Sequence, residues 1–383
     1  MSDDLGLDLG DLGDIPVPPS EQEAPAITDA FDYNVAFKMG FIGVGQCGGR
    51  IAATFNKLGY GRVCAVNTTI QDLAELKLPD EHKLDVGDAR GAGKDPAAAA
   101  ALFADKDEDV FDLLKRSWGD DVDYGFVCLA AAGGTGAGGY QKVVEIVKRY
   151  LKHCKRPEKV GVIVALPRDD EGQRFAKNAI HTVRGLSGMD LSPIIIVDNQ
   201  KIRDLYPRLS VGQVHNTENT STAALMHLFN RLAGSDSDLT TFDRADCAKL
   251  LDSGLITFAA DTLLKWESAA DISTPIRDRL RRNVLASVDF AKSTVAGLIY
   301  ILNGNAYDEV ESADLDHGTA MFTRMLANDS TVFPGVYRGA RDGEASVKVL
   351  AMIGALPWPK GRLMELADRA GESRDDVEKF LGV

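Results

Sequence analysis

The chain has 383 residues, of which 45% are hydrophobic, with a formal net charge of −14 and five cysteines that form no Cys-x-x-Cys pair. This composition favours two domains with short extensions, and it argues against a structural zinc site and against direct binding of nucleic acid. No apolar run approaches the roughly 20 residues that span a bilayer, and the acidic first residues lack the basic segment of a secretory signal, so we expect a cytoplasmic protein without membrane insertion.

The first 34 residues are expected to form a disordered acidic tail. Residues 1–32 contain no Lys or Arg, and the triplet Asp-Leu-Gly occurs three times between Asp4 and Gly13. Such a composition buries too little apolar surface to fold alone. A stretch at 12–16 is a candidate docking segment for a protein partner, and the alternative is a tail that only keeps neighbouring molecules apart.

Strand-like apolar runs alternate with helix-like stretches in the next part of the chain. Strands are expected at 36–44, 62–66, 124–129, 159–166 and 193–197, and helices at 49–58, 96–103, 140–150 and 174–186. This alternation predicts a parallel sheet with helices on both faces. Ligands of such sheets lie beyond the carboxyl ends of the strands.

The pattern changes after Gly254. Residues 294–302, 331–337 and 346–353 are β-like, 313–326 is helix-like, and two short charged helices are expected at 363–370 and 374–381. We therefore expect four regions: the tail at 1–34, a parallel-sheet domain at 35–255, a smaller α+β domain at 256–356 and a helical extension at 357–383.

The glycine-rich run from Ala132 to Gly138 is a candidate phosphate site. It has four glycines in seven residues and lies between a strand-like run and a helical pattern. Glycines let the backbone approach an anion and direct N–H groups at it, and the following helix adds its positive N-terminal end. The alternative is an ordinary glycine-rich turn.

A second glycine-rich stretch follows the first expected strand. Gly43, Gly45 and Gly48 fit the dinucleotide fingerprint Gly-x-Gly-x-x-Gly, but Asn67 stands near the place where that motif needs an acidic residue for the ribose. No Gly-x-x-x-x-Gly-Lys-Ser/Thr motif occurs. A dinucleotide-dependent oxidoreductase is therefore a minor alternative, which identification of the bound nucleotide would test.

Gly45-Gln46-Cys47-Gly48 and Gly133–Gly138 together resemble the nucleotide loops of the tubulin/FtsZ superfamily, in the family's order. The resemblance implies an α/β fold in which a parallel-sheet GTP-binding domain is joined by a core helix to a smaller α+β domain. It also implies binding of GTP and GDP with Mg²⁺. Departures from the usual motifs suit a divergent prokaryotic, archaeal, plasmid or phage-type member.

The resemblance assigns further contacts with the nucleotide. Gly91–Lys94 resembles the loop that closes over the terminal phosphate, and Glu171 the carboxylate that meets the ribose. Asn199 and Asn219 would read the guanine edge, and His215 would stack on the base. The full set of residues expected to bind the nucleotide is Gly45, Gln46, Cys47, Asn67, Gly91, Ala92, Gly93, Lys94, Gly133, Gly134, Thr135, Gly136, Ala137, Gly138, Glu171, Arg174, Asn199, His215 and Asn219.

Asp243 and Asp246 lie in a segment that resembles the FtsZ synergy loop. The resemblance implies that these two carboxylates are catalytic and complete the nucleotide site of the next subunit. The partner would then be a second copy of the chain, in a head-to-tail filament whose assembly stimulates GTP hydrolysis. Taken alone, Asp-x-x-Asp is more typical of a helix cap with a charge in the first turn.

Four departures from the family motifs bear on the rate of hydrolysis. Ala132 and Ala137 alter the glycine-rich loop, Thr69 stands where FtsZ usually has Asp, and Thr241 replaces the Asn of the synergy loop. The alternative function is therefore a nucleotide-binding filament scaffold, or a regulator of a related polymer, with little or no turnover.

Overall fold

The computed structural model describes residues 35–87, 92–93, 95–205, 211–237, 239–280, 282, 285–341 and 344–382, and for residues 211–219 it describes the backbone alone. The expected tail at 1–34 lies outside these residues. Within the described part of the chain, no helix is long and apolar enough to cross a membrane.

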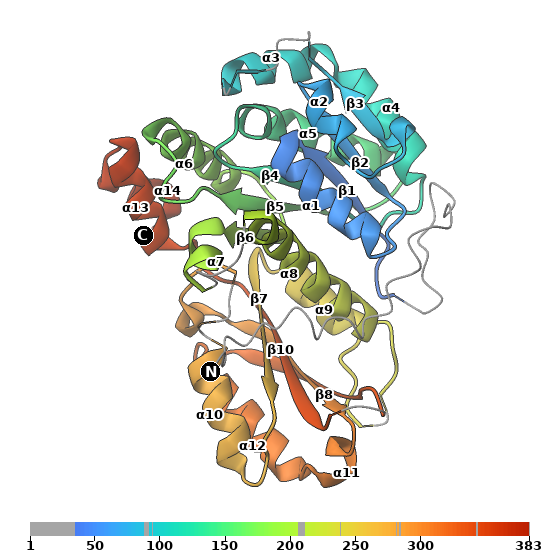
Figure 1. Cartoon of the computed structure of the whole chain (residues 1–383), viewed down its shortest axis with the longest axis vertical. Helices are drawn as coiled ribbons and strands as arrows, with labels where there is room; N and C mark the ends of the chain where they lie inside the picture. Colours follow the sequence, from blue (N-terminus) through green and yellow to red (C-terminus); the bar gives the residue numbers. More distant parts are fainter. Residues whose placement is uncertain are drawn as a thin grey trace.

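A sheet of ten strands, counted over the described residues, runs through the molecule in the order β3-β2-β1-β4-β5-β6-β7-β10-β8-β9 (Figure 1). The strands are β1 (Met39–Val44), β2 (Val63–Asn67), β3 (Lys83–Asp85), β4 (Tyr124–Ala130), β5 (Val160–Leu166), β6 (Ile194–Asp198), β7 (Leu255–Leu263), β8 (Val295–Asn303), β9 (Thr331–Arg338) and β10 (Ser346–Gly354). Strands β1 to β7 pair in parallel, so the expected parallel sheet is confirmed.

Strand β7 joins the two halves of this sheet. It pairs in parallel with β6 through Ile194–Leu255 and Ile195–Ile256, and in antiparallel fashion with β10 along most of its length. Strands β8 and β9 complete the second half. The change of pattern after Gly254 therefore marks the point where the sheet passes from parallel to mixed pairing.

Helices cover both faces of the parallel part. They are α1 (Gly45–Lys57), α2 (Ile70–Ala74), α3 (Pro96–Asp105), α4 (Asp107–Trp118), α5 (Gly134–His153), α6 (Gln173–Ser187), α7 (Asn199–Leu205) and α8 (Val211–Leu232). The remaining helices are α9 (Arg244–Leu251), α10 (Ala269–Arg279), α11 (Ala306–Glu309), α12 (Ser312–Thr323), α13 (Lys360–Ala370) and α14 (Arg374–Leu381).

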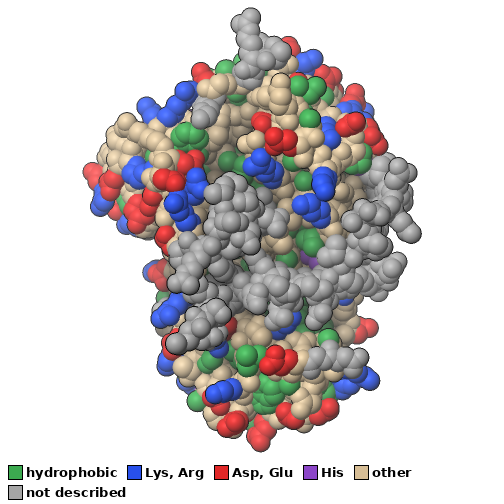
Figure 2. Space-filling view, in the orientation of Figure 1, with side chains coloured by type: hydrophobic (Ala, Val, Ile, Leu, Met, Phe, Trp, Pro, Cys, Tyr) green, Lys and Arg blue, Asp and Glu red, His purple; other side chains and the backbone are tan. Residues whose placement is uncertain are grey.

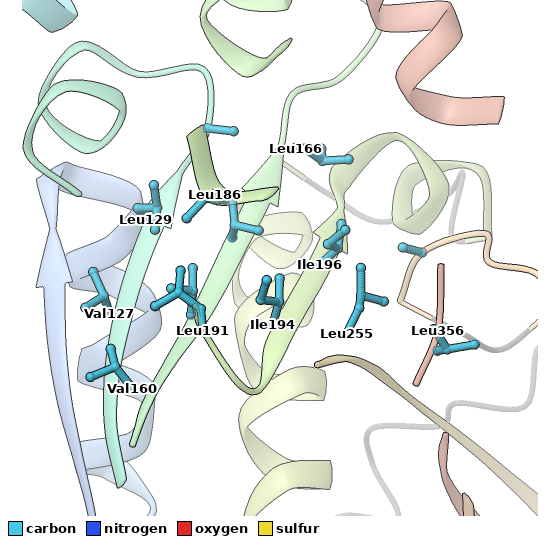
Figure 3. Packing of buried hydrophobic residues seen from close by; sticks show 14 of the residues in the cluster. Val127, Leu129, Val160, Leu166, Leu186, Leu191, Ile194, Ile196, Leu255 and Leu356 are labelled. Carbon is cyan, nitrogen blue, oxygen red and sulfur yellow. The ribbon is translucent and has the colours of Figure 1, made fainter. Parts of the chain in front are cut away.

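The strands are apolar on both sides because each side meets helices. In β1, Ile42 and Val44 belong to one buried cluster, whereas Met39 and Phe41 belong to the other. This alternation follows from the two-residue period of a strand. Figure 3 shows side chains of the first cluster across adjacent strands, from Val127 of β4 and Val160 of β5 to Ile194 of β6 and Leu255 of β7.

Helix α8 is the core helix that the family resemblance implies. Its second half is buried, with Ala223, Met226 and Phe229 all at most 1% exposed. Asn230 near its end accepts from the N–H of Phe37 over 2.8 Å and donates to the carbonyl of the same residue over 2.9 Å. Figure 1 shows α8 running from the parallel part of the sheet towards the mixed part.

Three expected helix starts are wrong, at Gly49, Tyr140 and Leu363, because α1, α5 and α13 each begin earlier. Helix α1 begins at Gly45 and α5 at Gly134, so most of each glycine-rich stretch lies in a first helical turn. Glycine has a low helix propensity, but close packing requires it here. A Cβ atom on Gly48 would lie 2.1 Å from the carbonyl oxygen of Cys128, on β4.

The C-terminal helices α13 and α14 form, as expected, a short extension. They pack against α6 of the parallel-sheet half (Figure 1). The limits of the four expected regions stay a prediction.

Candidate functional site

A pocket of about 500 Å³ opens at the carboxyl ends of the parallel strands. Its lining includes the last residues of β1, β4 and β5, which are Val44, Ala130 and Leu166, and the residue after β6, Asn199. The volume lies within the range typical of small-molecule sites. Its position is the one expected for a ligand of an open parallel sheet.

Two helices begin at this pocket. Gly133, the N-cap of α5, has extended backbone angles, and a Cβ atom there would meet nothing within 4 Å. Gly45 opens α1 with φ of +75°, a conformation that favours glycine, and a Cβ atom on it would lie 3.2 Å from the Gly136 nitrogen. The first N–H groups of a helix have no partner within the helix, so both ends can donate to an anion.

Thr68 connects three segments that surround the pocket. Its hydroxyl lies 2.8 Å from the hydroxyl of Thr135 in α5, and it accepts from the N–H of Ala92 over 3.2 Å. The side chain is 1% exposed. Thr68 therefore fixes the end of β2 relative to α5 and to the segment before α3.

Asp72 anchors a second set of contacts. Its carboxylate accepts from the side-chain amide of Gln46 over 2.9 Å and from that of Asn67 over 2.9 Å. The Oδ1 atom of Asn67 in turn accepts from the N–H of Thr68 over 2.7 Å. Gln46 and Asp72 line the pocket, whereas Asn67 supports them from behind.

The other side of the pocket is formed by Pro167, Glu171, Phe175 and Asn199. The carboxylate of Glu171 accepts from the N–H of Arg168 over 2.9 Å, which fixes its direction within the loop between β5 and α6. Burial raises the pKa of Asp198, which precedes Asn199, and the neighbouring Arg362 opposes this shift.

Eleven of the residues expected to bind the nucleotide line the pocket: Gly45, Gln46, Cys47, Ala92, Gly93, Gly133, Gly134, Thr135, Gly136, Glu171 and Asn199. Asn67, Ala137, Gly138 and Arg174 do not belong to the lining. Gly91 and Lys94 lie outside the described residues, as do the side chains of His215 and Asn219, whose backbone lies in α8.

Several pocket residues were not predicted from the sequence: Arg50, Thr68, Asp72 and Phe175. Arg50 and Phe175 lie one helical turn, or less, from residues that were identified, so extending each motif along its helix would have found them. Asp72 has no such signal, because its contact with Gln46 joins residues 26 apart.

Asp243 and Asp246 lie at the amino ends of the parallel strands, on the side of the sheet opposite to the pocket. The adjacent Arg244 contacts the carbonyl of Ala36 and lies 3.4 Å from Asp123, which precede β1 and β4. The seven residues of β4 span about 20 Å from these amino ends to the pocket at the carboxyl ends. Within one subunit, the structure does not bring the two carboxylates to the pocket.

Asp243 also caps a helix, as the motif alone would suggest. Its side chain accepts from the N–H of Asp246 over 2.9 Å at the start of α9. The carboxylate of Asp246 lies 3.6 Å from the ammonium of Lys249. The cap and the charge in the first turn stabilise α9 whatever else these residues do.

Comparison with known proteins gives the same family throughout. Residues 38–207 match the Tubulin/FtsZ family, GTPase domain. The tubulin-like protein TubZ of Bacillus cereus is 23% identical over 90% of this chain and 85% of its own length. The tubulin-like protein CetZ of Methanothrix thermoacetophila is 24% identical over 86% of this chain and 90% of its own.

A solved structure shows the same fold. It is a GTPγS-form protofilament of TubZ from Bacillus thuringiensis serovar israelensis, with a TM-score of 0.75 and 18% identity, and the match covers 91% of this chain and 95% of that one. At this identity the likeness concerns the fold alone. The family assignment rests on the matching GTPase domain and on the relatives. This chain belongs to the tubulin/FtsZ superfamily of cytoskeletal GTPases.

Proposed function

We propose that this protein binds GTP and GDP, hydrolyses GTP and polymerises head-to-tail, each subunit completing the active site of its neighbour. One observation supports the proposal: the pocket lies at the carboxyl ends of the parallel strands and the Asp243–Asp246 segment at their amino ends. Stacking one subunit on the next brings the amino ends of one sheet against the pocket of the neighbour. Such a heterologous contact need not close, so it produces a filament. That a TubZ structure is a protofilament supports this proposal.

The phosphates would lie at the starts of α1 and α5, where Gly45 and Gly133 to Gly136 offer backbone N–H groups. Ala92 and Gly93 approach the same end of the pocket, and the adjoining Gly91 and Lys94 would close over the terminal phosphate. The ribose would lie near Glu171 and the base near Asn199, with His215 and Asn219 of α8 on the base. Asn67 supports Gln46 through Asp72. Ala137, Gly138 and Arg174 lie beside this set rather than in the lining.

Magnesium would enter with the nucleotide. Among the described residues, no three His, Cys, Asp or Glu side chains are grouped so that they could hold a metal ion. The pocket does carry oxygen donors that suit this cation, on Thr68, Asp72 and Thr135. These residues would hold it jointly with phosphate oxygens, and when bound it would offset the negative charge of the phosphates.

The carboxylates of Asp243 and Asp246 would act on the neighbour's nucleotide. Facing the terminal phosphate, they would orient the attacking water and accept its proton, while the helix N-termini stabilise the charge on the phosphate oxygens. A lone subunit would bind GTP without these carboxylates. Hydrolysis and assembly are thereby linked.

The test is the GTPase rate per subunit as a function of protein concentration, followed together with light scattering. The rate should rise with concentration as filaments form. Asp243→Asn keeps a side chain that can cap α9 but removes its charge, so it should assemble with little turnover. Asp289→Asn, which changes a similar exposed cap elsewhere, is the matched control. A rate per subunit that does not depend on concentration would contradict the proposed coupling.

A nucleotide-binding scaffold with little turnover is the second candidate. The cap that Asp243 supplies to α9 favours it, because this contact alone gives the aspartate a structural role. Single-turnover hydrolysis measured on assembled filaments separates the two candidates. A protein partner of residues 1–34, the absence of direct nucleic-acid binding and a cytoplasmic location stay predictions.

A further inference from the structure

The C-terminal helices α13 and α14 lie against the base side of the pocket. The side-chain amide of Gln173, at the start of α6, donates to the carbonyl of Ala370 over 3.2 Å. Arg184 of α6 pairs with Glu372 at 3.2 Å, and its guanidinium lies 5.2 Å from the ring centre of Phe380. Figure 2 shows basic and acidic side chains intermixed on the flank where Figure 1 places these helices.

Arg369 of α13 holds the loop at 167–171, between β5 and α6, from outside the pocket. Its guanidinium donates to the carbonyl of Arg168 over 3.2 Å, to the carbonyl of Asp169 over 2.6 Å and to the carbonyl of Glu171. It also lies 3.0 Å from the carboxylate of Asp169. A planar guanidinium can span several acceptors in this way, which a lysine ammonium cannot.

Arg362 holds the same loop at a second point and adds the end of β6. It donates to the carbonyl of Pro167 over 2.7 Å, to the carboxylate of Asp169 over 2.6 Å and to that of Asp198 over 3.2 Å. The side chains of Arg362 and Asp198 are each 5% exposed. The position of Asn199, which follows Asp198, therefore depends on a residue far along the chain, in the C-terminal extension.

The residues held in this way form the base side of the pocket, which is the part where the ribose and base are proposed to lie. Pro167, Glu171 and Asn199 line the cavity, and the two arginines bind the backbone or carboxylates directly beside them. The phosphate side depends on other contacts, made by Thr68 and by the start of α5. The two sides of the pocket are thus supported by different parts of the chain.

We propose that α13 and α14 form a positioning clamp for the nucleoside part of the ligand, with Arg369 and Arg362 as its positioning residues. The clamp sets the affinity for the ribose and base through Glu171 and Asn199 and leaves phosphate binding unchanged. This inference rests on the proposed nucleotide function. Because coupling between sites is reciprocal, nucleotide binding also stabilises the docked helices.

The test compares GTP with inorganic tripolyphosphate as ligands of the full chain. Arg369→Gln should weaken GTP binding about tenfold, while tripolyphosphate affinity should stay within about twofold because the phosphate side is untouched. Arg369→Lys should recover part of the loss, because lysine keeps the positive charge but lacks the planar guanidinium that donates to several carbonyls. Arg374→Gln is the matched control, since Arg374 pairs with Asp368 within the same helices.

A double-variant comparison asks whether Arg369 acts through Glu171. If it does, Arg369→Gln combined with Glu171→Gln should weaken GTP binding no more than the larger single effect. Additive losses, equal losses for both ligands or an unchanged GTP affinity in Arg369→Gln would each overturn the clamp. Failure of the unaltered protein to bind GTP would instead overturn the proposed function itself.

A measurement on the unaltered protein covers the case in which the variants do not fold. Hydrogen exchange of the α13 and α14 amides is followed with GDP, with tripolyphosphate and without ligand. Stronger protection with GDP than with tripolyphosphate supports the clamp. Equal protection with both ligands overturns it.

Discussion

The backbone N–H of Phe242 donates to the hydroxyl of Tyr337 over 3.0 Å. The same hydroxyl lies 3.0 Å from the carbonyl oxygen of Leu232, the last residue of α8, to which it donates. Burial raises the pKa of Tyr337 to about 12, so the hydroxyl stays protonated and able to donate. One residue of β9 thus fixes both ends of the segment that leads from α8 to Asp243.

Replacing Tyr337 by Phe should loosen this segment. The change leaves the Phe242 N–H without its partner and removes the contacts of the hydroxyl with the carbonyls of Leu232 and Phe242, which should lower the free energy of unfolding by about 1–3 kcal/mol. Because Asp243 follows directly, the assembly-dependent GTPase rate should fall while GTP affinity, measured on the dilute subunit, stays unchanged. Urea unfolding, steady-state hydrolysis and nucleotide titration give the three quantities.

Tyr300→Phe is the control for that variant. Tyr300 is also buried in the second half of the molecule, and its hydroxyl donates to Leu315 over 3.2 Å. This control should lose stability but keep its GTPase rate. Equal loss of rate in both variants would show that stability, and not the anchoring of the segment, governs turnover.

Thr68→Val should weaken nucleotide binding. Valine has nearly the same shape, but it removes the hydroxyl that joins Thr135 and the N–H of Ala92. With the Ala92 N–H left unpaired in a buried place and the half-buried Thr135 hydroxyl deprived of this contact, we expect the affinity for GTP and for tripolyphosphate to fall about tenfold, equivalent to roughly 1.4 kcal/mol. Thr68→Ser keeps the hydroxyl and should bind both ligands within about twofold of the unaltered protein. Full binding by the valine variant would show that this network does not shape the phosphate side.

Most strands of this protein could be predicted from the sequence because each of those is a short apolar run with turn residues around it. The starts of α1 and α5 could not be predicted, since glycines such as Gly48 are poor helix formers in isolation and occur here for packing, whereas α3 and α14 begin where the pattern places them. Strand β3, which spans only Lys83–Asp85, was missed, and so was strand β7. It carries Asp261 and Thr262 near its end, which obscures the apolar pattern that marks the other strands.

The pocket could be predicted only as far as local motifs extend. Gly45, Gly133 and Glu171 belong to motifs, and the structure places them around one cavity. The support behind them depends on contacts between distant segments, and the pair formed by Arg362 and Asp198 joins residues 164 apart. No local pattern marks such a pair.

Gly48→Ala should strongly destabilise the fold. The added Cβ atom would lie 2.1 Å from the carbonyl oxygen of Cys128, and because the neighbour is backbone, α1 would have to move away from β4. We expect the free energy of unfolding to fall by at least about 2 kcal/mol. In Gly361→Ala, the contrasting variant on α13, the new Cβ meets nothing within 4 Å, so stability should rise by about 0.5–1 kcal/mol. Chemical denaturation measures both, and a neutral Gly48→Ala would contradict the tight contact.

His227 should make stability depend on pH between about 4 and 6.5. This side chain of α8 is 1% exposed, its Nδ1 atom lies 3.3 Å from the hydroxyl of Tyr60, and burial lowers its pKa to about 4. In this range the unfolded chain binds a proton at His227 that the folded chain does not. Stability therefore falls as the pH falls through the range, and the contribution is complete above pH 6.5.

The size of this effect can be measured by urea unfolding at pH 7.5 and pH 5.0. Protonation of His227 in the unfolded chain should cost the unaltered protein about 2 kcal/mol between these values. His227→Gln cannot titrate, so its stability should fall by about 2 kcal/mol less over the same interval, whatever its stability at pH 7.5. His317→Gln, at an exposed position of α12, controls for the loss of a histidine as such. Parallel losses in the unaltered protein and in His227→Gln would show that other groups carry the pH dependence, because only the buried imidazole differs between the two.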